Sequence, residues 1–166
     1  MVEQLKNQKL VSIGRTCNLL WINLGTEILK KNRYGKEIKA GEYVVDFQCA
    51  WRIQDCKTKD IKLASGDMYE PCSTIEWSET FEWDVQGNNA CDEKLPILFP
   101  AGQQIYVKDV FLSENGDLKL VFSNDLIFSC FVDDSLGREC WRFFLRSGGD
   151  HFVVSGIEMG LDEDEE

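Results

Sequence analysis

Residues 43–53 have the sequence Tyr-Val-Val-Asp-Phe-Gln-Cys-Ala-Trp-Arg-Ile. Apolar side chains occupy every second position of this stretch: Tyr43, Val45, Phe47, Cys49, Trp51 and Ile53. A side-chain period of two is typical of a β-strand with one buried face. Burial of six such groups contributes roughly 9 to 18 kcal/mol before the chain entropy is set against it. We therefore expect one long strand here that lies in the core.

The C-terminal half continues this strand pattern. An Asn115-Gly116 pair between two apolar runs is a strong signal for a β-hairpin. Further apolar runs follow at short intervals, so we expect at least four consecutive antiparallel strands in this half. The predicted strands are residues 105–112, 118–122, 126–132, 141–145 and 152–157.

The N-terminal part contains shorter strand signals after a polar leader that forms a helical turn or frays. Residues 10–13 and 19–24 are two short apolar runs, and residues 61–63 are a third. Residues 28–39 carry five cations around the turn signal Asn32-Arg33-Tyr34-Gly35. We expect an exposed hairpin or loop at this basic segment, and we favour a solvated loop over a binding patch.

Residues 73–85 allow two predictions. Apolar side chains recur at odd positions between Ile75 and Val85, with Glu79 interrupting, which favours a strand over a helix. The competing prediction is a short helix that begins at Ser73, because Glu76 three positions later completes a capping box.

We predict a mainly β fold of antiparallel strands, arranged as a sandwich, a rolled sheet or a barrel. One or two short helices are expected, among them a brief helix that Asp92 caps and that ends by Phe99 because prolines limit its length. A chain of 166 residues fits a single β-rich domain, here residues 1–160. The acidic run at residues 161–166 is expected to be a disordered tail.

Two short segments of the chain are similar to each other. Residues 49–53 are Cys-Ala-Trp-Arg-Ile, and residues 139–143 are Glu-Cys-Trp-Arg-Phe. A Gly-Asp-x-aromatic set follows each segment, at residues 66–69 and 149–152. This similarity suggests two related halves, and coincidence among residues that favour strands is the alternative.

Each of these segments contains an arginine next to a tryptophan. Neighbouring strand residues face opposite ways, so Arg52 and Arg142 are expected on the face opposite the tryptophans. Structural ion pairs are the role that we favour for both arginines. The candidate partners are Asp46, Asp67 and Glu139.

The protein is strongly acidic. Its 18 Lys and Arg residues and 29 Asp and Glu residues give a net charge of −11. Such a charge repels phosphate backbones, so we expect no nucleic-acid partner. A basic protein partner would be attracted, and the alternative is that the charge only keeps the protein soluble.

The seven cysteines are odd in number, and their spacing matches no zinc or redox motif. We expect reduced, mostly buried thiols, which are typical of a reducing compartment. The N-terminal residues lack the apolar run of a signal peptide, and no stretch is long enough to span a bilayer. We therefore expect a cytoplasmic protein with no membrane partner.

Few residues of this sequence are candidates for catalysis. His151 is the single histidine, and no nucleophile is near it in sequence, so we do not favour a Cys-His pair. Asp84, Asn88, Asp92 and Glu93 cluster oxygen ligands that suit a hard cation. A loop in which Asn and Asp bind their own backbone is the interpretation that we favour for them. We expect no metal, no cofactor and no catalytic residue.

Two of the five tryptophans, Trp77 and Trp83, are in an acid-rich segment. Core packing is the simpler interpretation for both. Aromatic anchors surrounded by acids are also what an interface with a basic partner uses. The acids nearest to these tryptophans are Glu76, Glu79 and Glu82.

The chain also resembles a known group of proteins at five segments: residues 49–53, 65–71, 83–89, 139–143 and 150–154. In these segments it is similar to a group of small bacterial proteins, chiefly from Gram-positive bacteria, with C-x-W-R and W-D-x-x-G-x-N motifs. The resemblance covers the chain from about Leu10 to Ile157, and its motifs assign no chemistry. An association of such proteins with toxin and immunity genes would imply a binder that occludes a toxin.

We therefore expect a non-enzymatic cytoplasmic binding protein, of the kind that inhibits a basic toxin domain as an immunity protein. Its predicted binding residues are Trp77, Trp83, Glu76, Glu79 and Glu82. One alternative is a small-molecule-binding β-barrel with an apolar cavity. The other is an enzyme in which acids converge with an arginine in a pocket. The residues of that enzyme site would be Arg52, Asp67, Asp84, Glu139 and Arg142.

Overall fold

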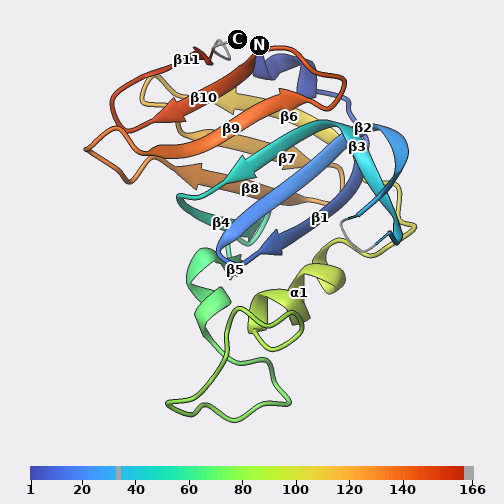
Figure 1. Ribbon diagram of the computed structural model, residues 1–166, viewed down its shortest axis with the longest axis vertical. Helices are drawn as coiled ribbons and strands as arrows, with labels where there is room; N and C mark the ends of the chain where they lie inside the picture. The colour runs from blue at the N-terminus through green and yellow to red at the C-terminus, as the bar shows by residue number, and fades with distance from the viewer. Residues whose placement is uncertain (33–34, 163–166) are drawn as a thin grey trace.

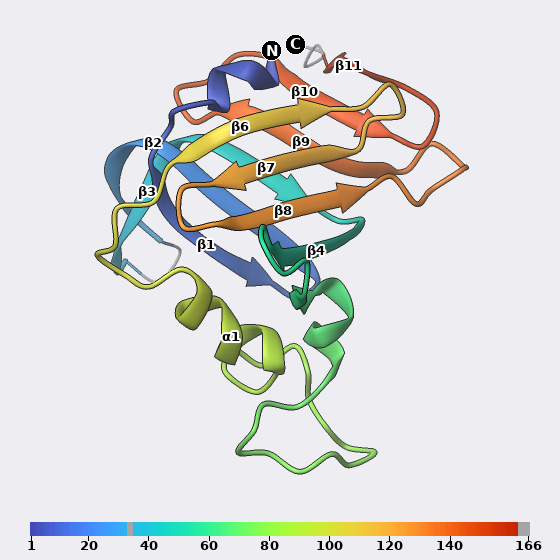
Figure 2. The same cartoon turned by 180° about the vertical axis from the view of Figure 1, so that it is seen from behind.

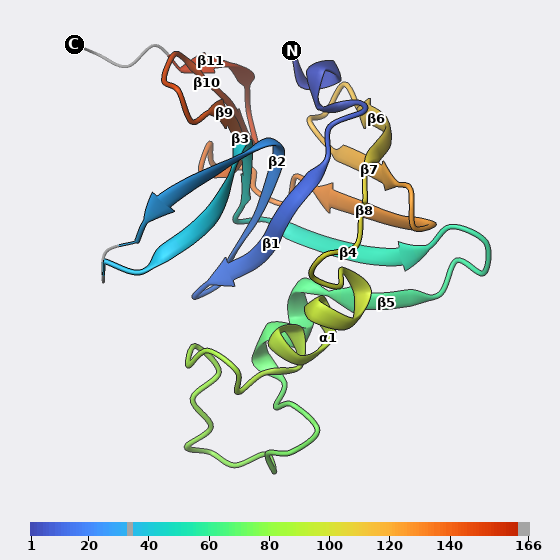
Figure 3. The same cartoon turned by 90° about the vertical axis from the view of Figure 1, so that its right-hand side faces the viewer.

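Two antiparallel sheets pack face to face in the computed structural model, which describes residues 1–32 and 35–162 (Figure 1; Figure 3). The six-stranded sheet has the order β1 (Leu10–Thr16), β2 (Leu19–Lys31), β3 (Glu37–Phe47), β9 (Glu139–Leu145), β10 (His151–Ser155) and β11 (Met159–Asp162). The five-stranded sheet has the order β5 (Ile61–Ala64), β4 (Ala50–Asp55), β8 (Leu126–Phe131), β7 (Leu118–Phe122) and β6 (Val107–Leu112). The prediction of a mainly β, antiparallel sandwich is confirmed.

The sheets remain open, so the barrel alternative is wrong. Strands β1 and β11 are the edges of one sheet, and β5 and β6 are the edges of the other. Large side chains from both inner faces fill the space between the sheets. The largest fully buried side chains are Trp141, Phe47, Phe122, Phe128 and Phe143.

The prediction of one continuous strand over residues 43–53 is wrong in one respect. Strand β3 ends at Phe47 and β4 begins at Ala50 in the other sheet. The chain changes sheets at Gln48 and Cys49, whose N–H groups both donate to the carbonyl of Cys140, at 2.8 and 3.1 Å. The alternation itself is correct, because both sheets bury their inner faces in the same core.

The two halves of the chain repeat one topology. Strands β1, β2 and β3 form a meander, and β4 then crosses to the other sheet, where it pairs with β8. Strands β6, β7 and β8 form a second meander, and β9 then crosses back to pair with β3. In each crossing strand the similar tryptophan faces the core, and the cross-strand pairs are Trp51 with Cys130 and Trp141 with Phe47.

The second part of the sequence similarity does not coincide with this topology. Residues 66–69 belong to the 3-10 helix η2 (Ser65–Tyr69), which follows β5. Residues 149–152 instead lead into β10. The two Gly-Asp-x-aromatic sets are therefore not structurally equivalent.

The predicted Asn-Gly hairpin is confirmed as β6 and β7, which pair up to Leu112 and Leu118. Gly116 in its turn has a φ of +88°, a conformation that glycine adopts without strain. Its carbonyl accepts a hydrogen bond from Trp141 Nε1 at 2.8 Å, so the turn is fixed to the core. A Cβ atom at this position would come within 2.5 Å of Val154 Cγ1.

Other predicted elements lie close to their expected places. The leader forms the 3-10 helix η1 (Val2–Leu5), and the basic segment is a hairpin in which β2 and β3 pair out to Lys31 and Glu37. Arg33 and Tyr34 of its turn lie outside the described residues. Strand β11 was not predicted and extends to Asp162, so two residues assigned to the tail pair with β10. The remaining tail residues, 163–166, lie outside the described part of the chain.

The single α-helix among the described residues, α1 (Ala90–Leu98), begins three residues earlier than predicted. Asn89 is its N-cap: it has extended backbone angles, and its side chain accepts a hydrogen bond from the Asp92 N–H at 2.9 Å. Asp92 is therefore inside the first turn of the helix and does not cap it. Asn and Asp are equally good caps, so the sequence alone did not distinguish them.

Candidate functional site

A long loop between η2 and α1 projects from one end of the sandwich (Figure 1; Figure 3). We call residues 71–89 the acidic loop, because they contain four carboxylates and no Lys, Arg or His. Its two ends are held together by a bridge between Pro71 and Asn89 and by a hydrogen bond from Cys72 N–H to the Asn88 carbonyl at 2.8 Å. The loop is therefore closed at its base.

The acidic loop contains neither the strand nor the helix predicted for residues 73–85. Some of its backbone groups form hydrogen bonds within local turns. The Ile75 N–H donates to the Cys72 carbonyl, and the Phe81 N–H donates to the Ser78 carbonyl, each at 3.0 Å. A strand also needs a neighbour to pair with, and this segment pairs with neither sheet. Alternating apolar residues alone did not indicate whether such a neighbour exists.

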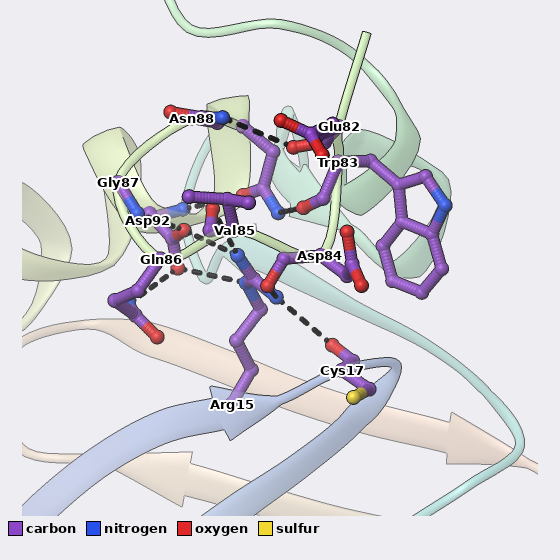
Figure 4. Close-up of polar contacts among 11 residues, drawn as sticks. Arg15, Cys17, Glu82, Trp83, Asp84, Val85, Gln86, Gly87, Asn88 and Asp92 are labelled. Carbon is purple, nitrogen blue, oxygen red and sulfur yellow. Dashed lines mark hydrogen bonds and ion pairs between the residues drawn. The ribbon is translucent and has the colours of Figure 1, made fainter. Parts of the chain in front are cut away.

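A buried ion pair connects the acidic loop and α1 to β1 (Figure 4). Arg15 Nε donates to Asp92 Oδ1 at 2.8 Å, and Arg15 Nη2 donates to Asp92 Oδ2 at 2.5 Å. The side chains are 1% and 4% exposed, respectively. This two-pronged geometry is the strongest form of an arginine–carboxylate contact.

All hydrogen-bond donors of the Arg15 side chain have acceptors. Arg15 also donates to the backbone carbonyls of Cys17, Asp84 and Val85, at 3.1, 3.4 and 3.2 Å. Its five N–H groups therefore all have acceptors, as a buried guanidinium requires.

Asp92 in turn organises the end of the loop. Its carboxylate accepts hydrogen bonds from Gln86 Nε2 at 2.9 Å and from the Gly87 N–H at 2.7 Å. The segment from Asp84 to Gly87 is thus attached to both members of the ion pair.

Two asparagines hold the preceding residues, and Figure 4 labels one of them, Asn88, beside Glu82. Asn89 Nδ2 donates to the Trp83 carbonyl at 2.8 Å, and Asn88 Nδ2 donates to the Glu82 carbonyl at 3.1 Å. The Trp83 ring packs edge-on against Tyr69 of η2, with ring centroids 4.8 Å apart. One arm of the loop, residues 82–89, is therefore fixed by side-chain hydrogen bonds and ring packing.

The predicted binding residues lie on the surface of this loop. The side chain of Trp77 is 65% exposed, so core packing is wrong for this residue. Trp83 is half-buried against Tyr69 and is not part of the core. The three carboxylates predicted with them are all exposed: Glu76, Glu79 and Glu82.

The residues of the enzyme alternative do not converge. Arg142 and Glu139 form the predicted ion pair on β9, whereas Asp67 lies in η2, 3.5 Å from Lys94 Nζ. Asp84 is exposed in the acidic loop. These acids therefore occupy three separate places in the fold.

Arg52 does not form the expected ion pair. Its guanidinium carbon lies 4.9 Å from the ring centroid of Phe131, and Arg52 Nε is buried without a hydrogen-bond partner. Asp46, the remaining expected partner, lies opposite Arg142 in the pairing of β3 with β9. Burial raises the pKa of the Asp46 carboxyl, although Arg142 and Arg146 act in the opposite direction.

Three of the buried thiols are poor nucleophiles. Burial raises the pKa of Cys91 to about 12, and it also raises the pKa of Cys130 and Cys140. A thiol must lose its proton to react, so these groups are inert near neutral pH. His151 stacks on Phe144 and accepts a hydrogen bond from Arg142 Nη1 at its Nδ1 atom, at 3.0 Å.

The oxygen cluster considered for a hard cation serves the loop instead. Arg15, Gln86 and Gly87 bind Asp92, and Ser73 binds Glu93 through its N–H and its hydroxyl. The hydrogen bonds from Ser73 lower the pKa of Glu93. Within residues 1–32 and 35–162, no group of three or more His, Cys, Asp or Glu side chains is placed to hold a metal ion.

Arg15 is the residue of this site that the sequence analysis missed. The available signal was a charged residue at the end of an apolar strand run, but Asp92 is 77 positions away. Only the fold brings the two residues together.

Comparisons with known protein families, with curated proteins and with solved structures found no match. The resemblance drawn from the motifs therefore stays a prediction. No helix of the described chain is long and apolar enough to cross a membrane.

Proposed function

We propose that this protein is a non-enzymatic binding protein that captures a basic protein partner with its acidic loop. The observation that carries the proposal is Trp77, a large apolar side chain 65% exposed on a closed loop of four carboxylates without a cation. Aromatic side chains that lose water on contact are the usual energetic centres of protein interfaces. Surrounding carboxylates favour a positively charged partner over other surfaces.

The two kinds of residue have different tasks in this proposal. Glu76, Glu79 and Glu82 attract a cationic partner over a distance and accelerate its approach, in a way that salt weakens. Trp77 keeps the partner bound once water has left the contact, and so it sets the rate of dissociation. Trp83 widens the apolar area beside it while it remains packed on Tyr69.

The anchoring of the loop supports this function. A free loop loses conformational entropy when it binds, and this loss subtracts from the affinity. In this protein, the Arg15–Asp92 pair and the asparagine contacts order residues 82–89 before any partner arrives. Less binding energy is then spent on ordering this arm, which carries Glu82 and Trp83.

The partner class that fits best is a basic toxin domain, which would make the protein an immunity-type inhibitor in the cytoplasm. The acidic loop would occlude cationic side chains of the toxin, including those that contact its own anionic substrate. A nucleic-acid partner does not fit, because the net charge of −11 repels phosphates.

Cross-linked capture from a lysate of the source organism tests the proposal. The baits are the unmodified chain, Trp77→Ala, the triple variant E76K/E79K/E82K, and Leu136→Ala as a matched control for loss of an exposed apolar side chain. Leu136 is 79% exposed between β8 and β9, far from the acidic loop in sequence. A second charge control, E3K/E114K/E158K, changes three exposed acids outside the loop.

We expect the unmodified chain and both controls to capture the same basic proteins. Trp77→Ala and the triple loop variant should fail to capture them. Quantitative mass spectrometry of the captured proteins gives this comparison. Equal capture by the loop variants and by their controls would overturn the proposal, as would a set of captured proteins that is acidic.

A further inference from the structure

A pocket of about 500 Å³ lies on the outer face of the five-stranded sheet. Strands β4, β8, β7 and β6 form its floor. Figure 2 shows this face of the strands with no described helix over it. A volume of this size is typical of sites for small molecules. The pocket is unusual in this acidic protein because cations line it: Arg52, Lys59 and Lys119.

The register of the strands places two of these cations on either side of a hydroxyl. Arg52 pairs with Ser129, and Ser129 pairs with Lys119, so the three side chains lie in one row on the same face. Adjacent strands are about 4.8 Å apart, which puts the backbones of Arg52 and Lys119 about 10 Å from each other. Ser129 is buried between them and forms the floor.

The positive charge of this row is not neutralised by carboxylates. Arg52 lies over the Phe131 ring and Lys119 lies 5.5 Å from the centroid of the Phe111 ring, so aromatic faces hold both cations. No ion pair of the described residues includes either cation. The one acid of the pocket, Asp117, already accepts the Val132 N–H at 2.8 Å.

Arg52 gives the second indication of a ligand, because no described residue accepts a hydrogen bond from its guanidinium group. Its Nε–H is buried and has no partner, whereas its Nη groups are open to solvent. An anionic oxygen of a ligand would accept hydrogen bonds from these Nη groups. The same oxygen would also relieve the repulsion between Arg52 and Lys119.

The walls indicate what else the ligand contains. Phe111 is 53% exposed, and Leu112 and Ile127 border the same pocket. A flat apolar group can therefore lie beside the charged end of the ligand.

We infer that this pocket binds an organic anion, whose carboxylate or phosphate group sits above Ser129 between Arg52 and Lys119, and whose apolar ring lies against Phe111. The Arg52 Nη groups and the Lys119 ammonium donate to the anionic oxygens. The inference is independent of the acidic loop and of its partner.

Titration of the ¹⁵N-labelled full chain with 1-naphthyl phosphate tests the inference, followed by NMR at the amide signals and the arginine Nε–H signals. We expect a saturable shift of the Arg52 Nε–H signal together with the amides of Ser129 and Lys119. A parallel titration with 1-naphthoate distinguishes a carboxylate from a phosphate ligand. A second one with inorganic phosphate measures how much the apolar ring contributes to the affinity. The neutral 1-naphthamide should bind at least about tenfold more weakly, since it lacks the charge that both cations recognise.

Lys119→Gln should weaken the binding of 1-naphthyl phosphate by about tenfold or more, because one charge-assisted contact is lost. Lys119 is exposed, so this variant keeps the fold even if Arg52→Gln does not. The matched control is Lys62→Gln on β5 of the same sheet, where Lys62 lies 3.6 Å from Asp60. Absence of a saturable shift would overturn the inference, and so would equal affinities for Lys119→Gln and Lys62→Gln, or for the phosphate and the amide.

Discussion

Replacement of Arg15 by Met is the perturbation that the structure describes in most detail. The variant leaves the Asp92 carboxylate in a site where its side chain is 4% exposed, with only Gln86 and Gly87 as donors. Removal of one partner of a buried pair costs about 3–5 kcal/mol, because the remaining charge is not compensated. We expect a loss of that size in the free energy of unfolding, measured by urea denaturation at pH 7.

The double variant R15M/D92L separates the lost charge from the lost packing. It removes both charges, so it should recover at least half of the loss, although the Gly87 N–H then lacks its acceptor at a cost of about 1–3 kcal/mol. The control is Lys6→Met, which breaks the exposed pair with Asp109 and should change stability by less than about 1 kcal/mol.

Hydrogen exchange locates the effect of Arg15→Met. Amides of residues 82–89 should lose protection first, because the arginine binds the carbonyls of Asp84 and Val85 and orders their neighbours through Asp92. If Arg15→Met costs no more stability than Lys6→Met, or if the loop amides exchange as in the unmodified chain, the ion pair does not anchor the loop.

Three further predictions concern the scaffold. Gly116→Ala should lower the free energy of unfolding by about 1–3 kcal/mol, more than Gly148→Ala, because both glycines have positive φ but only Gly116 would bring a Cβ against Val154; equal thermal shifts would contradict this. Burial raises the folded-state pKa of Asp46 above its unfolded value. The stability that the protonated carboxyl contributes is therefore present below the unfolded pKa and is lost as the pH rises through the folded-state pKa. Asp46→Asn should therefore be more stable than the unmodified chain at pH 7 and not at pH 3, and denaturation curves without this pH dependence would refute the sign. Native alkylation followed by mass spectrometry should label the exposed Cys17 first and leave the buried Cys91 unmodified, and early labelling of Cys91 would show that its site opens.

The sequence predicted the faces of the strands better than their ends. Alternation from Val45 to Ile53 marked the residues that point into the core, because a strand exposes every second side chain to the same side. It did not mark the change of sheet at Gln48 and Cys49, since both sheets share one core and the alternation continues through the bend.

The candidate site was predictable only in part. Trp77 and the nearby glutamates were identified from composition, because aromatic side chains among acids are informative without any knowledge of the fold. The same alternation that identified true strands predicted a false one at residues 73–85, where no neighbouring strand offers pairing. The Arg15–Asp92 pair could not be predicted from the sequence, because its two residues are far apart in the chain and only the packing of α1 near β1 brings them together.

Association and dissociation rates of a captured basic partner measure the role of the acidic loop most directly. In biolayer interferometry at low salt, E76K/E79K/E82K should slow association, whereas Trp77→Ala should speed dissociation by about 30-fold if the side chain contributes about 2 kcal/mol. The controls E3K/E114K/E158K and Leu136→Ala should match the unmodified chain in both rates. If the two loop variants bind and release the partner as these controls do, the acidic loop is only a solvated surface and the proposed function is wrong.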